Sequence, residues 1–332
     1  MKSAKVSNRT YLRIAIIVLT LVLIMSVVLF SVNLWESNQG GGFLPGGGSG
    51  QKIVNYNGQE YVFRDELETF LIMGLDKYEM TGNEDDFTNN MQADFLILFI
   101  FDKENESYST IQINRDSMTK MNVLGVAGQS VGTVTKQIAL AHTYGNGRTT
   151  SCRNTADAVS ELLCGVEIDY YMSLTMDAVA ILNDKVGGVE VTIAEGFVGV
   201  DPDLTPGETV RLKGDQALRY VRTRMGLEDS SNAARMKRQQ QYLQALHQQV
   251  QQSVKDSESF AVDAVLSISD YMVSNCTSTQ LQRFFYAASD YQYKGISTIE
   301  GQSVVGEKFM EFYPNADSVR ETVARLLCEP KR

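Results

Sequence analysis

The pattern of hydrophobic and polar positions divides the chain into an apolar N-terminal run, a glycine-rich stretch and a long mixed part. Residues 14–35 contain no charged side chain and are almost wholly apolar. About 20 such residues are needed for a helix to cross the hydrocarbon core of a bilayer. Residues 39–50 are mostly glycine, a composition typical of a flexible tether. We therefore predict a single transmembrane helix, then a linker and a folded part.

Charges on either side of the apolar run predict its orientation. Lys2, Lys5, Arg9 and Arg13 precede the run, and Glu36 is the first charge after it. The positive-inside rule then places the N-terminus in the cytoplasm and the C-terminal domain outside, as in a single-pass type II protein of the cell membrane. A cleaved signal peptide is the alternative. It is disfavoured because the run is longer than a typical signal-peptide core and no clear small-x-small site follows.

In the long part, short apolar runs typical of strands alternate with runs of helical periodicity. The run at residues 94–101 has no polar alternation, which favours a central strand covered on both faces. Strands are expected at residues 60–63, 69–74, 94–101, 107–113, 189–193 and 217–221. Helices are expected at residues 134–143, 154–163, 174–183, 235–255 and 316–327. The mixture predicts an α/β fold, a layered α-β-α domain with a central mixed sheet.

These patterns together give the expected domain organisation. It consists of a cytoplasmic N-terminus at residues 1–13, a transmembrane helix at 14–35, a flexible linker at 36–55, a main domain at 56–257 and a C-terminal extension at 258–332 that packs on that domain. The formal net charge is −10. Such a charge disfavours nucleic acid as a partner, since binding it would need a wide basic face.

The four cysteines, Cys152, Cys164, Cys276 and Cys328, all follow the apolar run. An even number in an oxidising compartment permits disulfides, and three pairings remain open. On one continuous helix, Cys152 and Cys164 would lie about three turns apart, beyond disulfide reach. The chain has no Cys-x-x-Cys or histidine-rich pattern, so a thiolate metal site is not expected.

One segment of this acidic chain, residues 217–241, concentrates basic side chains. If it forms a strand and then a helix, residues two apart on the strand share a face, as do residues three and four apart on the helix. The side chains that would converge are Arg222 and Arg224 from the strand and Arg235, Arg238 and Gln239 from the helix. Arginine forks suit phosphate oxygens, so a phosphate site is predicted, with a salt-bridged helix surface as the alternative.

Acidic residues flank two of the expected strands. Asp76 ends one strand, and Asp94 begins the next. If these strands are antiparallel neighbours, the two carboxylates converge near the arginines, an arrangement that suits a magnesium ion whose shell a phosphate completes. Turn or capping roles are the alternative. Arg115 ends a third strand and adds a guanidinium there, unless it only forms a local ion pair with Asp116.

A rival motif points to a hydrolase. Residues 128–132 match the Gly-x-Ser-x-Gly nucleophile elbow. The only histidines available are His142 and His247, both on expected helices, and the preceding residues 121–127 make a poor core strand. The elbow is therefore disfavoured.

Seven short motifs, taken together in their order, resemble the LytR-CpsA-Psr family of membrane-anchored cell-wall enzymes. They are residues 74–76 (Gly-Leu-Asp), 92–94 (Gln-Ala-Asp), 114–116 (Asn-Arg-Asp), 141–145 (Ala-His-Thr-Tyr-Gly), 183–189 (Asn-Asp-Lys-Val-Gly-Gly-Val), 217–224 (Ala-Leu-Arg-Tyr-Val-Arg-Thr-Arg) and 232–239 (Asn-Ala-Ala-Arg-Met-Lys-Arg-Gln). The resemblance covers roughly residues 68–246. It identifies the main domain as a catalytic domain.

The resemblance implies a phosphotransferase that moves a glycopolymer, such as wall teichoic acid or capsule, from an undecaprenyl-pyrophosphate carrier to peptidoglycan. It implies Mg²⁺ held by Asp76 and Asp94. The residues implied to hold the pyrophosphate are Arg115, Arg222, Arg224, Arg235, Arg238, Gln239 and Gln92, and those implied to be catalytic are Asp94, Arg115, Arg222 and Arg224. The lipid tail would need an apolar tunnel, which Phe95, Ile97 and Val179 would line if they are not simply core residues.

Three positions depart from the family pattern. Gln92 stands where the family has arginine, Asn232 where it has aspartate, and Gln137 where it has lysine. Losing a charged contact to phosphate usually costs about 1.5–3 kcal/mol. The departures therefore keep an alternative open, a non-catalytic member that binds polyprenyl phosphates or regulates envelope assembly.

Overall fold

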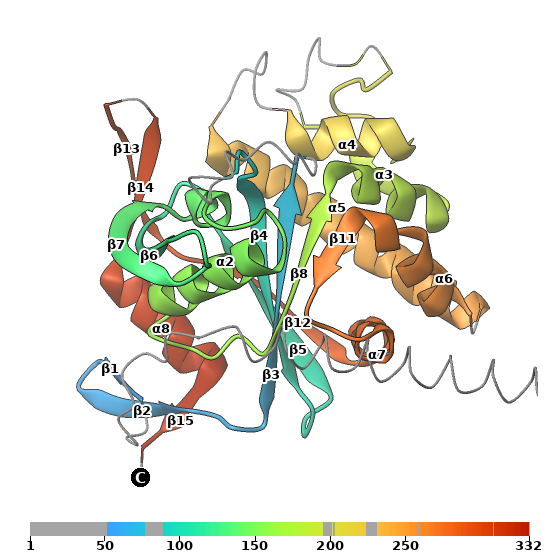
Figure 1. The fold of residues 1–332 in the computed structure, drawn as a ribbon. Helices are drawn as coiled ribbons and strands as arrows, with labels where there is room; N and C mark the ends of the chain where they lie inside the picture. Colours follow the sequence, from blue (N-terminus) through green and yellow to red (C-terminus); the bar gives the residue numbers. More distant parts are fainter. Residues whose placement is uncertain are drawn as a thin grey trace, which may run out of the picture. The chain divides into compact units, whose positions relative to one another are not determined.

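The computed structural model describes residues 52–76, 89–194, 201, 203–223, 231–257, 259–307 and 309–331 (Figure 1). The expected transmembrane helix at residues 14–35 and the catalytic candidate Arg224 lie outside these residues. Among the helices that are described, none is long and apolar enough to span a membrane. Residues 53–56, at the expected boundary between linker and domain, already form a strand.

A mixed six-stranded sheet lies at the centre of the domain. Its strands, in spatial order, are β11 (Met272–Ser274), β8 (Tyr170–Thr175), β3 (Leu67–Leu75), β4 (Ala93–Asp102), β5 (Ser107–Ile113) and β12 (Gln292–Thr298). β3 runs antiparallel to β4 and parallel to β8, and β5 runs antiparallel to β4 and parallel to β12. The expected central strand at 94–101 and the mixed sheet are confirmed.

Helices cover both faces of this sheet (Figure 1). On β3, Leu71 and Met73 face a core that includes α2 (Thr149–Leu162) and α8 (Ala316–Leu327). Phe70, on the other face of β3, packs in a second core with residues of α6 (Phe260–Ser267) and α7 (Ser278–Asp290). Successive side chains of a strand point to opposite faces, so the apolar run of β3 serves two layers. The α-β-α layering is confirmed.

The other elements surround these layers. They are β1 (Ile53–Tyr56), β2 (Gln59–Phe63), β6 (Met118–Leu124), β7 (Ser130–Gln137), the 3-10 helix η1 (Ile138–Thr143), α3 (Met176–Lys185), β9 (Val189–Thr192), β10 (Thr209–Leu212), α4 (Gly214–Arg222), α5 (Asn232–Asp256), the 3-10 helix η2 (Ser269–Tyr271), β13 (Gly301–Val305), β14 (Met310–Pro314) and β15 (Cys328–Pro330). β15 pairs with β2, and β11 and β12 belong to the central sheet. The C-terminal residues are thus built into the same fold.

Four sequence predictions were wrong in kind or extent. The helix expected at 154–163 is α2, which begins at Thr149. The expected strand at 217–221 is part of helix α4, because Ala217, Tyr220 and Val221 are buried at helical spacing. The expected helix at 134–143 is a helix only from residue 138, since β7 pairs with β6 up to Gln137. The expected helix at 174–183 begins at Met176, where β8 ends.

Candidate functional site

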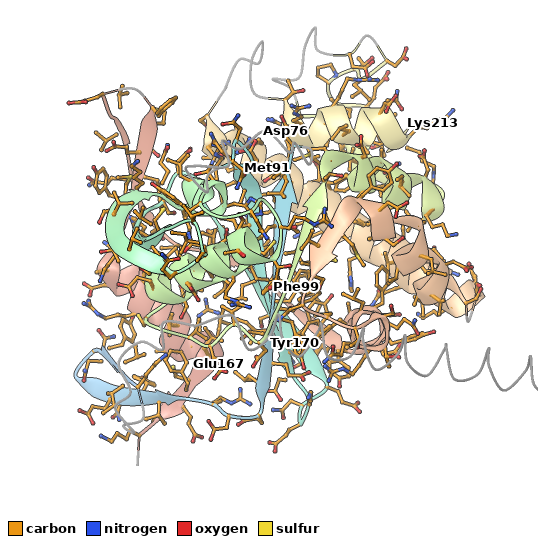
Figure 2. All side chains as sticks on the ribbon, viewed as in Figure 1. Asp76, Met91, Phe99, Glu167, Tyr170 and Lys213 are labelled. Atoms are coloured by element: carbon orange, nitrogen blue, oxygen red, sulfur yellow. The ribbon has the colours of Figure 1, made fainter. Side chains whose placement is uncertain are left out.

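The end of β3 and the start of β4 bring two acidic residues to one edge of the sheet. The strands are antiparallel, with Gly74 opposite Phe95 and Leu75 opposite Ala93. This jump in register makes Asp94 the extra residue of a β-bulge, a feature that re-aims a side chain next to many active sites. Asp76 directly follows β3. Figure 2 shows Asp76 and Met91 together at this edge, with Phe99 further along the sheet. The expected meeting of the two strand ends is confirmed.

Gly74 permits the close approach of β3 and β4 at this bulge. A Cβ atom on Gly74 would lie 2.9 Å from the Cβ atom of Phe95. We expect Gly74→Ala to lower the free energy of unfolding by about 1–3 kcal/mol, because overpacking forces neighbouring groups to shift. Gly132→Ala in β7 is the control, since its Cβ would meet nothing within 4 Å. Urea unfolding of both variants measures the difference, and equal stability of the two would contradict the packing argument.

Arg115, just after β5, is held by three side chains. Its guanidinium forms an ion pair with Asp94. Nη2 of Arg115 donates to the Gln92 side-chain oxygen at 2.5 Å, and Nε lies 3.5 Å from an Asp116 carboxylate oxygen. The structure therefore joins Gln92, Asp94 and Arg115, as predicted for one site, and it shows Gln92 as a hydrogen-bond acceptor for Arg115.

Asp76 and Arg222 form a second ion pair at the same edge. Nη2 of Arg222 lies 2.6 Å and 2.7 Å from the two carboxylate oxygens of Asp76. Both side chains are about half exposed, at 53% for Arg222 and 52% for Asp76. Arg222 comes from the C-terminal end of α4. The predicted strand at this position was wrong, yet the convergence of Arg222 with Asp76 is confirmed.

Arg235 lies in the first turn of α5, where a network of side-chain amides holds it. Nη2 of Arg235 donates to Asn232 Oδ1 at 2.5 Å and to the Asp94 carbonyl at 3.4 Å. Asn232 Nδ2 donates to Asn114 Oδ1 at 2.6 Å. An amide can donate and accept at once, whereas a carboxylate only accepts. Asn232 therefore links Arg235 to the end of β5 in a way that aspartate could not.

Arg238 and Gln239, one turn further along α5, contact the end of α4. Arg238 Nε donates to the Tyr220 carbonyl at 3.2 Å, and its Nη2 donates to the Thr223 carbonyl. Gln239 Nε2 donates to the Val221 carbonyl at 3.2 Å. These bonds fix the helix end that carries Arg222. The structure thus gives Arg238 a positioning contact rather than a place in the cavity described next.

A cavity of about 250 Å³, here called the site cavity, lies between the sheet and α5. Its charged and amide side chains are Asp94, Arg222, Arg235 and Gln239. Most of the remaining lining is apolar and includes the three side chains proposed for a lipid tunnel, Phe95, Ile97 and Val179. The site cavity therefore combines guanidinium groups with an apolar interior, as an amphiphilic phosphate ligand would require.

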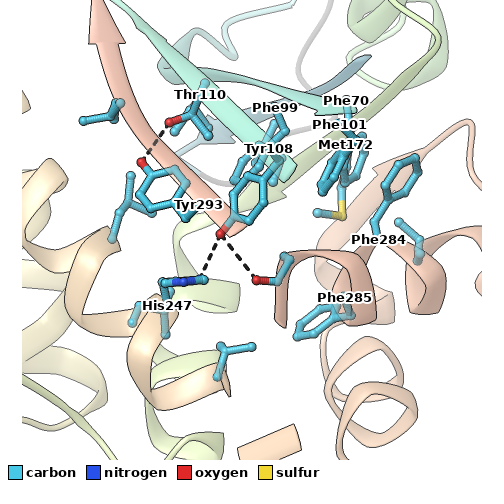
Figure 3. A pocket seen from close by; sticks show the side chains of 18 of the residues that line it. Phe70, Phe99, Phe101, Tyr108, Thr110, Met172, His247, Phe284, Phe285 and Tyr293 are labelled. Carbon is cyan, nitrogen blue, oxygen red and sulfur yellow. Dashed lines mark hydrogen bonds between the residues drawn. The ribbon is translucent and has the colours of Figure 1, made fainter. Parts of the chain in front are cut away.

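Figure 3 shows a second cavity of about 180 Å³, here called the aromatic cavity. It adjoins the site cavity, because both are lined by Ile72, Ile97 and Phe99. Its aromatic wall includes Tyr108, whose hydroxyl lies 2.9 Å from His247 Nδ1. Burial lowers the pKa of His247 and raises the pKa of Tyr108, so both stay uncharged at neutral pH. The apolar lining therefore continues from the site cavity, where the arginines lie, into the aromatic cavity.

The nucleophile-elbow motif does not form a hydrolase site. Ser130 starts β7 in a β-hairpin, where its hydroxyl donates to Asn122 Oδ1 at 3.2 Å. His142 is buried and its Nδ1 lies 3.1 Å from the Met91 carbonyl, and burial lowers its pKa to about 4. His247 contacts Tyr108.

The four cysteines are free thiols in the structure.

The donor set at the sheet edge fits a magnesium ion. Mg²⁺ prefers oxygen ligands and is usually held by one or two carboxylates, with substrate phosphates and water completing the shell. Asp76 and Asp94 are two such carboxylates on adjoining strands. No group of three or more His, Cys, Asp and Glu side chains forms a metal site within the described ranges. The protein would thus supply two ligands and leave the others to the substrate.

Comparison with known proteins decides the family. The LytR_cpsA_psr family model matches residues 49–325. The chain belongs to the LytR_cpsA_psr family. A curated relative from Halalkalibacterium halodurans, named polyisoprenyl-teichoic acid--peptidoglycan teichoic acid transferase TagU, is 29% identical over 72% of this chain and 69% of its own length.

Solved structures of other proteins share the fold of this chain. The crystal structure of B. subtilis TagV has a TM-score of 0.60 at 22% identity, and covers 80% of this chain and 98% of TagV. A structure described as TagT bound to LI-WTA has a TM-score of 0.59 at 19% identity, and covers 79% of this chain and 90% of TagT. The α-β-α layering seen here is therefore shared with these proteins.

The three residues that depart from the LytR_cpsA_psr pattern all form side-chain hydrogen bonds in the structure. Gln92 accepts from Arg115, and Asn232 bridges Asn114 and Arg235. Gln137 donates to the Met310 carbonyl at 2.5 Å, so it ties β14 to the end of β7. Two further residues of the site were not among the predicted site residues: Asn114, which accepts from Asn232, and the buried Thr175, which lines the site cavity. Asn114 directly precedes Arg115 at the end of β5, and this position in the sequence could have identified it as a site residue.

Proposed function

We propose that this chain is an extracytoplasmic phosphotransferase that attaches a glycopolymer from an undecaprenyl-pyrophosphate carrier to peptidoglycan. The proposal includes anchoring in the cell membrane by residues 14–35, supported by the uncharged run and the basic residues before it. The polymer class, wall teichoic acid or capsule, is not specified by the site. The curated relatives named as teichoic acid transferases favour the first.

One observation carries this proposal: charged groups and apolar side chains line the same cavity. Arg222 and Arg235 line the site cavity, and Ile97 and Val179 belong to its apolar lining. A polyprenyl pyrophosphate has the matching chemistry, since a diphosphate head is joined to a long hydrocarbon chain. Arginine holds phosphate oxygens through paired, charge-assisted hydrogen bonds.

The residues of the site suit transfer at phosphorus. The acceptor hydroxyl oxygen forms a bond to the polymer-side phosphorus, the bond from that phosphorus to the bridging oxygen breaks, and its electron pair leaves with undecaprenyl phosphate. The hydroxyl proton passes to solvent. Arg222 and Arg235 would hold the diphosphate in line and neutralise the growing charge. Arg115 would add a third positive charge, and its bonds to Gln92 and Asp94 keep it in place.

Asp76 and Asp94 would hold Mg²⁺, which when bound neutralises charge on the phosphate oxygens. Asp76 is paired with Arg222, and Asp94 with Arg115. These ion pairs hold both carboxylates at the edge of the sheet, next to the arginines proposed to bind phosphate.

The second candidate function is a non-catalytic member that binds polyprenyl phosphates or regulates envelope assembly. The neutral residues at positions 92 and 232 favour it. The deciding assay uses the full-length protein in detergent with Mg²⁺ and a synthetic undecaprenyl-pyrophosphate-linked sugar, and follows release of undecaprenyl phosphate. Release that depends on an acceptor supports the transferase, while binding without release supports the second function.

Removing the Arg222 guanidinium should weaken binding of undecaprenyl pyrophosphate. We expect Arg222→Ala to reduce affinity by about 1.5–3 kcal/mol, roughly tenfold to a hundredfold, as for other charged hydrogen bonds. Calorimetry on the full-length protein measures the change. Arg219→Ala is the matched control on the same helix, because Arg219 pairs with Asp201 at 2.7 Å and does not line the site cavity. Equal losses in the two variants would return Arg222 to a surface role.

A further inference from the structure

A buried hydroxyl beside the site cavity has no hydrogen-bond partner among the described residues. Thr175 is only 2% exposed, and its Oγ1 accepts and donates no bond there. Thr175 lines the site cavity together with Arg222 and Arg235. Leaving a buried hydroxyl unpaired is costly, and buried polar groups in proteins nearly always have a partner in the protein, in water or in a ligand. The hydroxyl therefore lacks the partner that such a group normally has, and Thr175 belongs to the wall of the site cavity.

Thr175 is also the N-cap residue of α3, yet it does not cap that helix. A threonine at this position normally accepts a hydrogen bond from an N–H of the first turn, and no such side-chain bond forms here. The N-terminal end of a helix carries unpaired N–H groups and a partial positive charge, which favour anions. The first-turn carboxylate, Asp177, is exposed to solvent. The Thr175 hydroxyl is thus not used to cap the helix that it precedes.

Strand register places this residue next to the acidic and basic groups of the site. Thr175 lies opposite Leu75, so it is one position from Asp76. The Met176 N–H donates to the Asp76 carbonyl at 3.4 Å, and Arg222 pairs with the Asp76 carboxylate. The neighbours of Thr175 along the chain include apolar residues of the same cavity wall, Leu174 before it and Val179 in α3. It therefore lies where the polar and apolar parts of the cavity lining meet.

We propose that Thr175, with the first turn of α3, binds the phosphate that stays attached to the prenyl chain. This inference rests on the proposed function and adds a residue to it. A prenyl chain in the apolar part of the cavity carries its first phosphate at the boundary with the polar part. A hydroxyl donor at that boundary meets this phosphate, while the arginines at the sheet edge remain for the second phosphate and for charge neutralisation.

The test compares a charged lipid with its uncharged counterpart. Binding of undecaprenyl phosphate and of undecaprenol to the full-length protein in detergent is measured for the wild type, Thr175→Val and Thr175→Ser. We expect Thr175→Val to weaken undecaprenyl phosphate about tenfold, equivalent to about 1.4 kcal/mol, and to leave undecaprenol unchanged. Thr175→Ser keeps the hydroxyl and should stay within about threefold of the wild type. Thermal unfolding verifies that each variant is folded.

Thr110→Val is the matched control in the aromatic cavity, where the Thr110 hydroxyl is paired with the Tyr293 hydroxyl at 3.0 Å. It should not discriminate between the two lipids. Thr175→Val that binds undecaprenyl phosphate as the wild type does would overturn the assignment. An equal loss for both lipids would also overturn it, because it would show a packing role. A wild type that binds neither lipid would overturn the proposed function itself, and the Thr175 assignment with it.

Discussion

Asp94→Asn should lower the transfer rate by about 100- to 1000-fold, the usual effect of removing one preorganised charged group from a transition state. The substitution keeps the volume of the side chain and removes its charge. It would weaken the ion pair that holds Arg115 and remove one of the two carboxylates proposed to bind Mg²⁺. The measurement is release of undecaprenyl phosphate from a synthetic lipid-linked sugar at saturating substrate.

The control for this prediction is Asp317→Asn. Asp317 has a side chain that is 84% exposed, lies on α8 and pairs with Arg320 at 2.9 Å in an exposed contact. Its loss should leave the rate unchanged. A rate for Asp94→Asn within about threefold of the wild type would remove Asp94 from the reaction. Normal lipid binding by a wild type with no turnover at all would favour the binding-protein alternative.

Val179→Trp should reduce affinity for undecaprenyl pyrophosphate by about a hundredfold. Val179 lines the site cavity from α3, so an indole there would fill space that the prenyl chain needs. Excluding roughly 120 Å² of apolar lipid surface, at about 25 cal/mol per Å², removes about 3 kcal/mol of binding free energy. Equilibrium binding to the full-length protein in detergent measures the loss.

Chain length provides the internal comparison for this variant. Dimethylallyl diphosphate has the same head group and a five-carbon chain, and its affinity should change by less than about threefold. Val131→Trp is the control substitution, because Val131 is 62% exposed on β7. If Val179→Trp weakens both ligands equally, the indole disturbs the phosphate groups rather than the chain. If it weakens neither, the prenyl chain lies outside the site cavity.

The sequence by itself determined the elements whose pattern is local and unambiguous. The unbroken apolar run of β4 predicts a strand covered on both faces, and the helical periodicity of α5 and α8 predicts helices with nearly the observed bounds. The sequence also identified the family, and it placed Asp76, Asp94 and Arg115 at strand ends that the structure confirms. Arg222 pairs with Asp76 as expected, although it comes from a helix and not from the expected strand. Local spacing is sufficient for such predictions because it depends only on neighbouring residues.

The tertiary structure alone decided the rest, because it depends on residues far apart in the chain. Residues 217–221 contain β-favouring Tyr220 and Val221, and only their burial against α5 and neighbouring elements makes the segment a helix. The Gln92–Arg115 bond joins two different strand ends. The two cavities, and the unpaired hydroxyl of Thr175 in one of them, arise where layers fail to fill the space between them. Such space is a property of packing, and no pattern along the chain encodes it.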